Sequence, residues 1–142
     1  MDMFNVILFI VSKHQGKSPS SKPDKPPPAH VVTVKDGMPV RYPGCEGIGV
    51  RVVHPSNQKA QAQALGLVMF YIPPHVKLES GSHFPEECYV VLRGAGVMTL
   101  NGERREVSAG TFIHLPSWCE HGIENTGDET MEVLICTSPP NP

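Results

Sequence analysis

The sequence has little excess of either charge and no long hydrophobic run. Its 142 residues include 12 Lys+Arg and 14 Asp+Glu, for a net charge of −2 at pH 7. A protein that binds nucleic acid through counterion release needs a basic face, so we expect no nucleic-acid partner. The apolar stretch at residues 4–11 is much shorter than the ~20 residues that cross a bilayer, so we expect no membrane association.

The cysteines also lack a pairing pattern. Cys45, Cys88, Cys119 and Cys136 form no C-x-x-C motif and no zinc-ribbon spacing. An acidic Asp2 near the start, and Ser12-Lys13-His14 after the apolar stretch, do not fit a secretory signal. We therefore expect reduced thiols and a cytoplasmic location. Residues 1–11 are interpreted either as a strand that pairs with a partner subunit's sheet edge or as an extension without regular structure.

Turn-forming residues, in contrast, are abundant. With 13 Gly and 15 Pro, the chain is a poor candidate for a helical bundle and a good one for an all-β domain. Residues 12–30 hold four lysines, one aspartate and five prolines, a composition typical of a disordered or polyproline-like linker. The chain length fits one domain. We therefore predict an N-terminal extension and Pro/Lys-rich linker at residues 1–30, and a single domain at residues 31–142.

From residue 31 the sequence consists of short β-branched runs separated by turn residues. Nine strands are predicted, at residues 31–35, 48–53, 66–72, 87–92, 96–100, 106–108, 111–115, 121–125 and 131–136. Asn101-Gly102, between two such runs, is the strongest hairpin signal in the chain. Residues 56–65 are rich in Gln and Ala, which fits a helix or a solvated loop equally well. This number of short strands predicts a two-sheet sandwich or a small barrel.

Two segments contain most of the residues whose side chains are suited to catalysis or metal binding. In the first, GSHFPEECYVVLRG at residues 81–94, His83 and Glu87 are four apart, so both point to one face of an extended chain. Such a pair is costly to bury without a partner; it indicates either a bound divalent cation or a His–Glu hydrogen bond at a sheet rim. In the second, GTFIHLPSWCEHGIEN at residues 110–125, a strand ends at Pro116 and the next strand begins at His121.

Together the two segments resemble the motifs of the cupin superfamily, whose members are double-stranded β-helix (jelly-roll) barrels. The second half of the first motif, His-x₃-Glu-x₆-Gly, matches His83, Glu87 and Gly94; the second motif matches Gly110, Pro116, His121 and Asn125. Three motif positions depart from the pattern, with His75 and Trp118 in place of glycines and Gly81 in place of the first histidine. The resemblance covers residues 66–136, half the chain.

The resemblance implies a mononuclear metal site with His83, Glu87 and His121 as ligands. Two histidines and one carboxylate are typical of non-haem Fe(II) oxygenases, and Fe(II) is favoured, but the same set serves Mn, Ni, Co or Zn. Because Gly81 offers no side chain, a fourth ligand is sought among His75, His114 and Cys119, each of which also fits ordinary packing or surface exposure. The remaining histidines, His14, His30 and His54, are expected to face solvent.

The alternation of side chains along a strand predicts which way further residues point. If Glu87 points inward, Tyr89 and Val91 do too, whereas Cys88, Val90 and Leu92 face away; Glu86 faces away from Glu87. Tyr89 and Arg51 are the candidate catalytic residues, with a hydroxyl near the bound ligand and a cation for an anionic substrate such as a carboxylate. The alternatives are a core tyrosine and an outward, solvated arginine. Trp118 either borders the pocket mouth or caps the core.

Three functions remain open. The favoured one is a small-molecule oxidoreductase of the non-haem Fe(II) dioxygenase type. The same site without redox chemistry serves a metal-dependent isomerase, lyase or decarboxylase. The third is a non-enzymatic ligand-binding cupin with a degenerate site, which the absence of a side chain at Gly81 supports. Because cupins commonly pair through sheet edges, the resemblance also implies a homodimer in which residues 31–35, with or without residues 4–11, cross to the partner.

Overall fold

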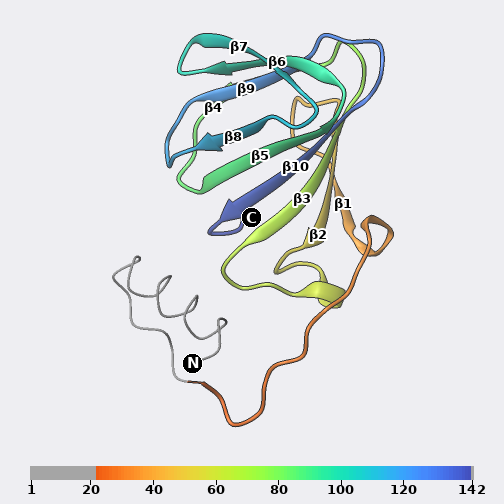
Figure 1. Cartoon of the computed structure of the whole chain (residues 1–142), viewed down its shortest axis with the longest axis vertical. Helices are drawn as coiled ribbons and strands as arrows, with labels where there is room; N and C mark the ends of the chain where they lie inside the picture. The colour runs from red at the N-terminus through yellow and green to blue at the C-terminus, as the bar shows by residue number, and fades with distance from the viewer. Residues whose placement is uncertain (1–21, 142) are drawn as a thin grey trace.

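The computed structural model describes residues 22–141, which form two antiparallel β-sheets (Figure 1). The six-stranded sheet has the order β1-β2-β3-β10-β5-β8, and the four-stranded sheet the order β4-β9-β6-β7. The strands are β1 Met38–Val40, β2 Ile48–Val53, β3 Gly66–Ile72, β4 Lys77–Gly81, β5 Glu86–Arg93, β6 Ala95–Leu100, β7 Glu103–Ser108, β8 Phe112–Leu115, β9 His121–Asn125 and β10 Met131–Ser138. The expected all-β jelly roll is confirmed. No helix of the described part is long and apolar enough to span a membrane.

Eight of the nine predicted strands are present, with small differences at their ends. The alternation of buried and accessible side chains is regular in β3, β5 and β10, the strands that form the centre of the larger sheet. In β5, Glu87, Tyr89 and Val91 are buried as predicted, while Glu86 and Leu92 are exposed. The predicted Asn101-Gly102 hairpin joins β6 to β7, and both of its residues have positive φ, at 48° and 83°. Such a turn suits the twist of the strands it joins.

The prediction of a strand at residues 31–35 is wrong. The chain instead forms a short 3-10 helix, η1 (Val34–Asp36), whose start is capped by the Asp36 carboxylate, which accepts from the Thr33 backbone N–H at 2.9 Å. This local bond competes with strand pairing. Conversely, β4 (Lys77–Gly81) has only one apolar side chain, Leu78, and was therefore not predicted as a strand. Residues 56–65 are mainly a loop containing the 3-10 helix η2 (Gln58–Ala60).

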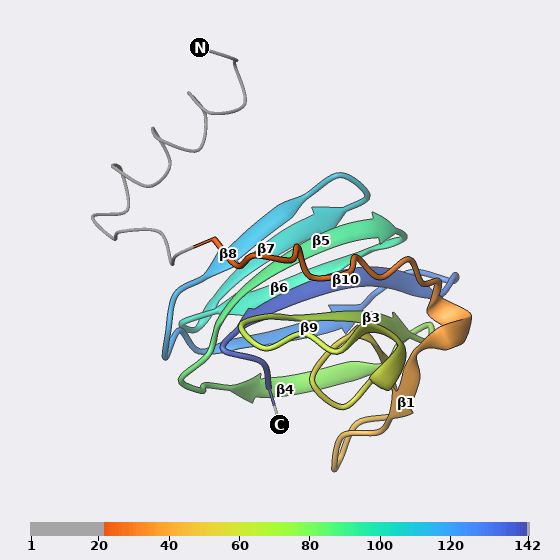
Figure 2. The ribbon, with the colours of Figure 1, turned by 90° about the horizontal axis from the view of Figure 1, so that it is seen from below.

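The described part of the N-terminal region lies outside the barrel. Residues 22–33 form no helix or strand and are almost entirely exposed. Figure 1 shows them below the sheets, and Figure 2, seen from below, shows them crossing in front of the sheets. The predictions for residues 4–11 and 12–21 lie outside the described residues. Nothing in the described residues tests the domain boundary at residue 30 or the homodimer, and both stay predictions.

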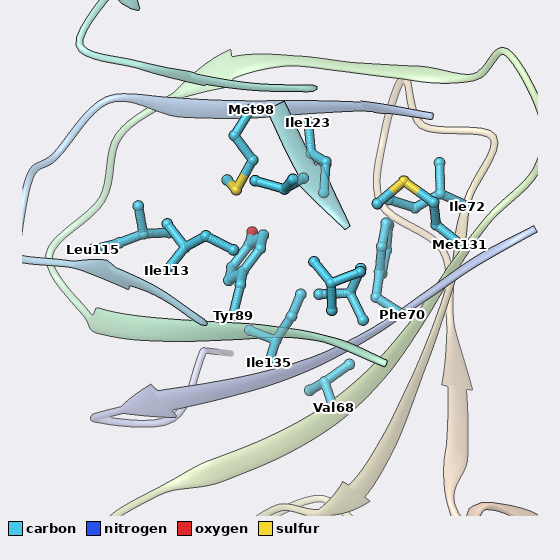
Figure 3. Packing of buried hydrophobic residues seen from close by; sticks show 13 residues of the cluster. Val68, Phe70, Ile72, Tyr89, Met98, Ile113, Leu115, Ile123, Met131 and Ile135 are labelled. Atoms are coloured by element: carbon cyan, nitrogen blue, oxygen red, sulfur yellow. The ribbon is translucent and has the colours of Figure 1, made fainter. Parts of the chain in front are cut away.

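The hydrophobic core lies between the two sheets, with side chains from both of them pointing inward (Figure 3). Its most buried side chains are Ile72, Val91, Met98, Leu115, Met131 and Val133. Full burial of an aliphatic side chain stabilises the fold by roughly 1.5–3 kcal/mol. At the C-terminal end of β9 lies Asn125, which is fully buried and donates from Nδ2 to the Ile72 and Glu129 carbonyls, both at 2.8 Å. These contacts fix one end of the strand that begins at His121.

Candidate metal centre

Two imidazoles and one carboxylate converge between the sheets. His83 lies in the loop between β4 and β5, Glu87 is the second residue of β5, and His121 begins β9. One ligand atom from each of the three residues lies within 4.8 Å of the others. The Glu87 Oε2 atom is 3.2 Å from His83 Nε2 and 3.1 Å from His121 Nε2. His83 and Glu87 thus lie close together as predicted, although His83 does so from a loop rather than from an extended strand.

The backbone hydrogen bonds of His83 and His121 determine which nitrogen of each ring directs its lone pair toward Glu87. His83 Nδ1 is 3.1 Å from the Pro85 carbonyl, and His121 Nδ1 is 2.9 Å from the Cys119 carbonyl. Since a carbonyl only accepts, both Nδ1 atoms carry the proton, and in neutral rings both Nε2 atoms present lone pairs. Backbone partners of this kind orient metal-ligating histidines in general.

The electrostatics of the cluster favour a cation at its centre. Glu87 is only 4% exposed, and its Oε2 makes no hydrogen bond with acceptable geometry within the described part of the chain. Burial lowers the pKa of the His121 imidazole, but the close contact with the Glu87 carboxylate, the Cys119 carbonyl and the Glu87 charge raise it more, so that it lies above the ordinary 6.5. Without a metal, the raised pKa favours a proton on His121 beside the Glu87 carboxylate. The donor set and its buried, unsatisfied oxygen thus fit a divalent cation.

None of the three suggested fourth ligands belongs to this cluster. His75 is exposed and its Nε2 lies 3.1 Å from Asp128 Oδ1, while His114 Nε2 lies 2.8 Å from Glu86 Oε2 on the solvent side. Cys119 Sγ is directed to the Glu120 carbonyl at 3.8 Å. The first motif position, Gly81, is the direct cross-strand neighbour of His121, and a Cβ there would meet no atom within 4 Å. Within the described part of the chain, the cluster therefore offers three candidate ligands, with open space at the Cβ position of Gly81.

A cavity of about 230 Å³ is lined by two of the three residues, His83 and Glu87. Val68, Phe70, Ile123 and Ile135 form apolar parts of its wall, and Tyr42, Arg51 and Thr137 contribute polar groups. Both predicted catalytic residues line this cavity, and Arg51 is half-buried rather than fully solvated. A second hollow of about 210 Å³ includes Gly81, His83 and His121. Each hollow thus borders two of the three residues of the cluster, and His83 lines both.

Tyr89 lies beside the cluster with its ring edge-on to His121, at a centroid distance of 5.8 Å. Figure 3 shows it rising from β5 between Ile113 and Ile135 toward the opposite sheet. Burial, followed by the charge of Glu87, raises the pKa of the phenol well above 10. Tyr89 is therefore protonated at neutral pH, and its hydroxyl is a hydrogen-bond donor rather than a base.

Three residues that line the cavity were not expected there from the sequence, and one of them, His54, was expected at the surface. His54 was expected to face solvent, but it is only 4% exposed and lines the cavity together with Tyr42 and Asn141. No short-range pattern marks these residues, because they meet only through the fold. Trp118 is 64% exposed and packs against Phe84 with ring centroids 6.5 Å apart. It lies among the lining residues of neither hollow described above.

Comparisons with known proteins show which proteins and which domain family this chain resembles. The cupin domain model Cupin_2 matches residues 68–137. The uncharacterized protein MJ1618 of Methanocaldococcus jannaschii is 34% identical over 107 residues, which are 75% of this chain and 77% of that protein. Dimethylsulfoniopropionate lyase DddW of Ruegeria pomeroyi is 36% identical over 58 residues, 41% of this chain but only 37% of the lyase.

A solved structure shows the same architecture. The structure of a predicted oxalate decarboxylase (tm1287) from Thermotoga maritima superposes with a TM-score of 0.65 and 24% sequence identity. The match covers 76% of this chain and 97% of that protein. At this identity the likeness concerns the fold. From the matching motifs, the jelly-roll topology and the family model, the chain belongs to the cupin superfamily.

Proposed function

We propose that this cupin is a metal-dependent enzyme that acts on a small organic acid, of the non-haem Fe(II) dioxygenase type. The observation that carries the proposal is the cluster of His83, Glu87 and His121, in which two oriented Nε2 lone pairs face a buried carboxylate oxygen. Two histidines and one carboxylate leave coordination positions open for O₂ and substrate in this class of enzyme. The adjoining cavity provides the space for a small substrate.

Each residue of the site has a distinct task in this proposal. Fe(II) held by the three ligands supplies the redox chemistry with O₂. The Pro85 and Cys119 carbonyls hold both imidazoles in the tautomer that directs Nε2 inward. Tyr89 keeps its proton on the phenol oxygen and donates a hydrogen bond to an oxygen of the substrate.

The substrate class follows from the cavity wall. Arg51 and the apolar side chains of Val68 and Ile135 face the same cavity. A guanidinium binds a carboxylate through two parallel N–H···O bonds, and apolar walls exclude water from the reacting end. A small carboxylic acid with an apolar body satisfies both requirements, which is why we assign this class.

A metal-dependent lyase or decarboxylase is the second candidate. It is supported by the similarity to the dimethylsulfoniopropionate lyase, although the aligned region is a minor part of that protein. In this version a metal held by His83, Glu87 and His121 would supply Lewis-acid chemistry at a substrate oxygen, without a change in oxidation state. The protonated Tyr89 phenol then stabilises negative charge that develops on that oxygen.

Metal analysis and oxygen uptake test the proposal. Protein purified without chelator is expected to bind one divalent ion per chain, and His121→Ala to lose that stoichiometric binding while keeping its β circular dichroism spectrum. His114→Ala is the matched control, because this exposed histidine lies outside the cluster. Unchanged metal content in the His121 variant would contradict the ligand assignment.

The reaction class is then separated with substrates. Fe(II)-loaded protein is expected to consume O₂ with a member of a panel of small carboxylic acids, and Arg51→Gln to raise KM for that acid without changing metal content. Turnover of an acid without O₂ uptake would favour the lyase or decarboxylase. Absence of both metal and turnover would leave a non-enzymatic binding cupin.

A further inference from the structure

The segment that follows β10 returns to the cavity and contacts the proposed metal ligand Glu87. Asn141 lines the cavity, and its Nδ2 donates to Glu87 Oε1 at 3.2 Å. Glu87 Oε2, the other oxygen of the same carboxylate, faces His83 and His121. The two oxygens of one carboxylate therefore have separate partners, an amide for one and the imidazoles for the other.

The position of Asn141 is itself fixed by a buried histidine. The Ser56 backbone N–H donates to His54 Nδ1 at 3.1 Å, so this nitrogen is an acceptor in the neutral ring. His54 Nε2–H accordingly donates to the Asn141 carbonyl at 2.7 Å. A weaker bond runs from the Asn141 backbone N–H to Thr137 Oγ1 at 3.4 Å. Two of these partners, His54 and Thr137, are at most 4% exposed, so the anchor is well shielded from water.

A glycine leaves room for this arrangement. A Cβ at Gly66 would lie 3.0 Å from Thr137 Oγ1, 3.2 Å from His54 Cδ2 and 3.6 Å from Pro140 Cβ. The first two distances are tighter than ordinary van der Waals contact. The chain from Thr137 to Asn141 thus lies against the start of β3 at a place where a larger side chain would push it away.

We propose that Asn141 is a positioning residue for the metal ligand Glu87. Its amide holds Oε1 away from the metal, so that Oε2 alone is presented as a single-oxygen ligand, and His54 holds Asn141 in place. This proposal rests on the proposed metal site. Without the Asn141 amide the carboxylate is free to rotate about its last torsion and to offer either oxygen or both. Loss of a partner that orients a ligand typically weakens metal affinity 10–100-fold.

The test uses Co(II), whose visible absorption reports coordination number and geometry. Asn141→Leu, which has a similar size but no amide, is expected to bind Co(II) 10–100-fold more weakly than the unaltered chain and to show a changed absorption spectrum. Ser138→Ala is the matched control, since it removes a hydrogen bond of the same segment, to the Ala64 carbonyl at 3.0 Å, without touching Glu87. It is expected to leave both the affinity and the spectrum unchanged. An Asn141→Leu variant with an affinity within twofold of the unaltered chain and the same spectrum would overturn the proposal.

A metal-free measurement separates this proposal from the proposed function. In chelator-treated protein, the side-chain amide protons of Asn141 are expected to exchange with water more slowly than in the Glu87→Ala variant, as followed by NMR. Equal exchange in the two folded proteins would refute the Asn141–Glu87 contact whether or not a metal binds. If the unaltered chain binds no Co(II) but shows the slow exchange, the metal-site proposal fails while the positioning of Glu87 by Asn141 stands.

Discussion

Asn125 offers a quantitative test of how the second cupin motif stabilises the fold. Its side chain is 0% exposed and makes three hydrogen bonds, to the Ile72 and Glu129 carbonyls at 2.8 Å and from the Gly127 N–H at 2.9 Å. A hydrogen bond contributes a net stabilisation of about 1 kcal/mol, and a buried group left without its partner costs about 1–3 kcal/mol. We therefore expect Asn125→Ala to lower the free energy of unfolding by about 3 kcal/mol or more.

Urea unfolding of chelator-treated protein, followed by circular dichroism, measures this effect without a contribution from bound metal. A loss of this size corresponds to a decrease in Tm of roughly 10 °C for a domain of this length. The exposed Gln63→Ala is the control and should change stability by at most about 0.5 kcal/mol. Because Asn125 lies at the opposite end of β9 from His121, metal affinity of the folded variant should be unchanged. A destabilisation below about 1 kcal/mol would refute this account of the three bonds.

The remaining predictions concern the metal centre directly. Gly81→His should tighten Co(II) binding in a titration, because Gly81 is paired with His121 across the strands and has open space at its Cβ; an unchanged affinity would show that an added imidazole cannot reach the metal. The pKa of His121 is higher in the folded chain than the ordinary 6.5, so protonation of His121 stabilises the metal-free fold. This stabilisation is complete below pH 6.5 and is lost as the pH rises through the raised pKa. Urea unfolding of chelator-treated protein should therefore show stability decreasing above pH 6.5, and this decrease should be absent in His121→Ala. Since the same proton competes with the metal, Co(II) affinity should increase over the same pH range, and a pH-independent affinity would contradict this competition.

The features predicted correctly from the sequence are those that depend on strand periodicity and on short sequence spacings. The alternation of β5 places Glu87 and Tyr89 inside the barrel, and the end of the preceding strand before Pro116 allows His121 to begin β9. These features are local, because in a strand each residue's face follows from the position of its neighbours. Strand alternation thus accounts for the inward direction of Glu87 and Tyr89, whereas His83, Glu87 and His121 were selected as ligands because they match the cupin motifs.

The sequence could not reveal contacts that are created by the fold. His54 and Asn141 are 87 positions apart, and no pattern within either segment indicates that they meet beside Glu87. His75 and Asp128 are likewise distant in sequence, and they meet at the surface, outside the cluster. Residues 31–35 have the composition of a strand, but the Thr33–Asp36 cap stabilises a 3-10 turn instead.

The alternation in β5 also limits which changes of chain length this domain can accept. Removing or adding one residue between Glu87 and Tyr89, inside β5, would place these two side chains on opposite faces of the strand, so that only one of them could point into the barrel. A two-residue insertion would restore the faces, but would displace the carboxylate by about 7 Å along the strand. That distance exceeds the 4.8 Å within which the three ligand atoms now lie. An insertion scan through residues 87–91 should therefore abolish metal binding, whereas insertions in the exposed stretch at residues 22–30 should be neutral.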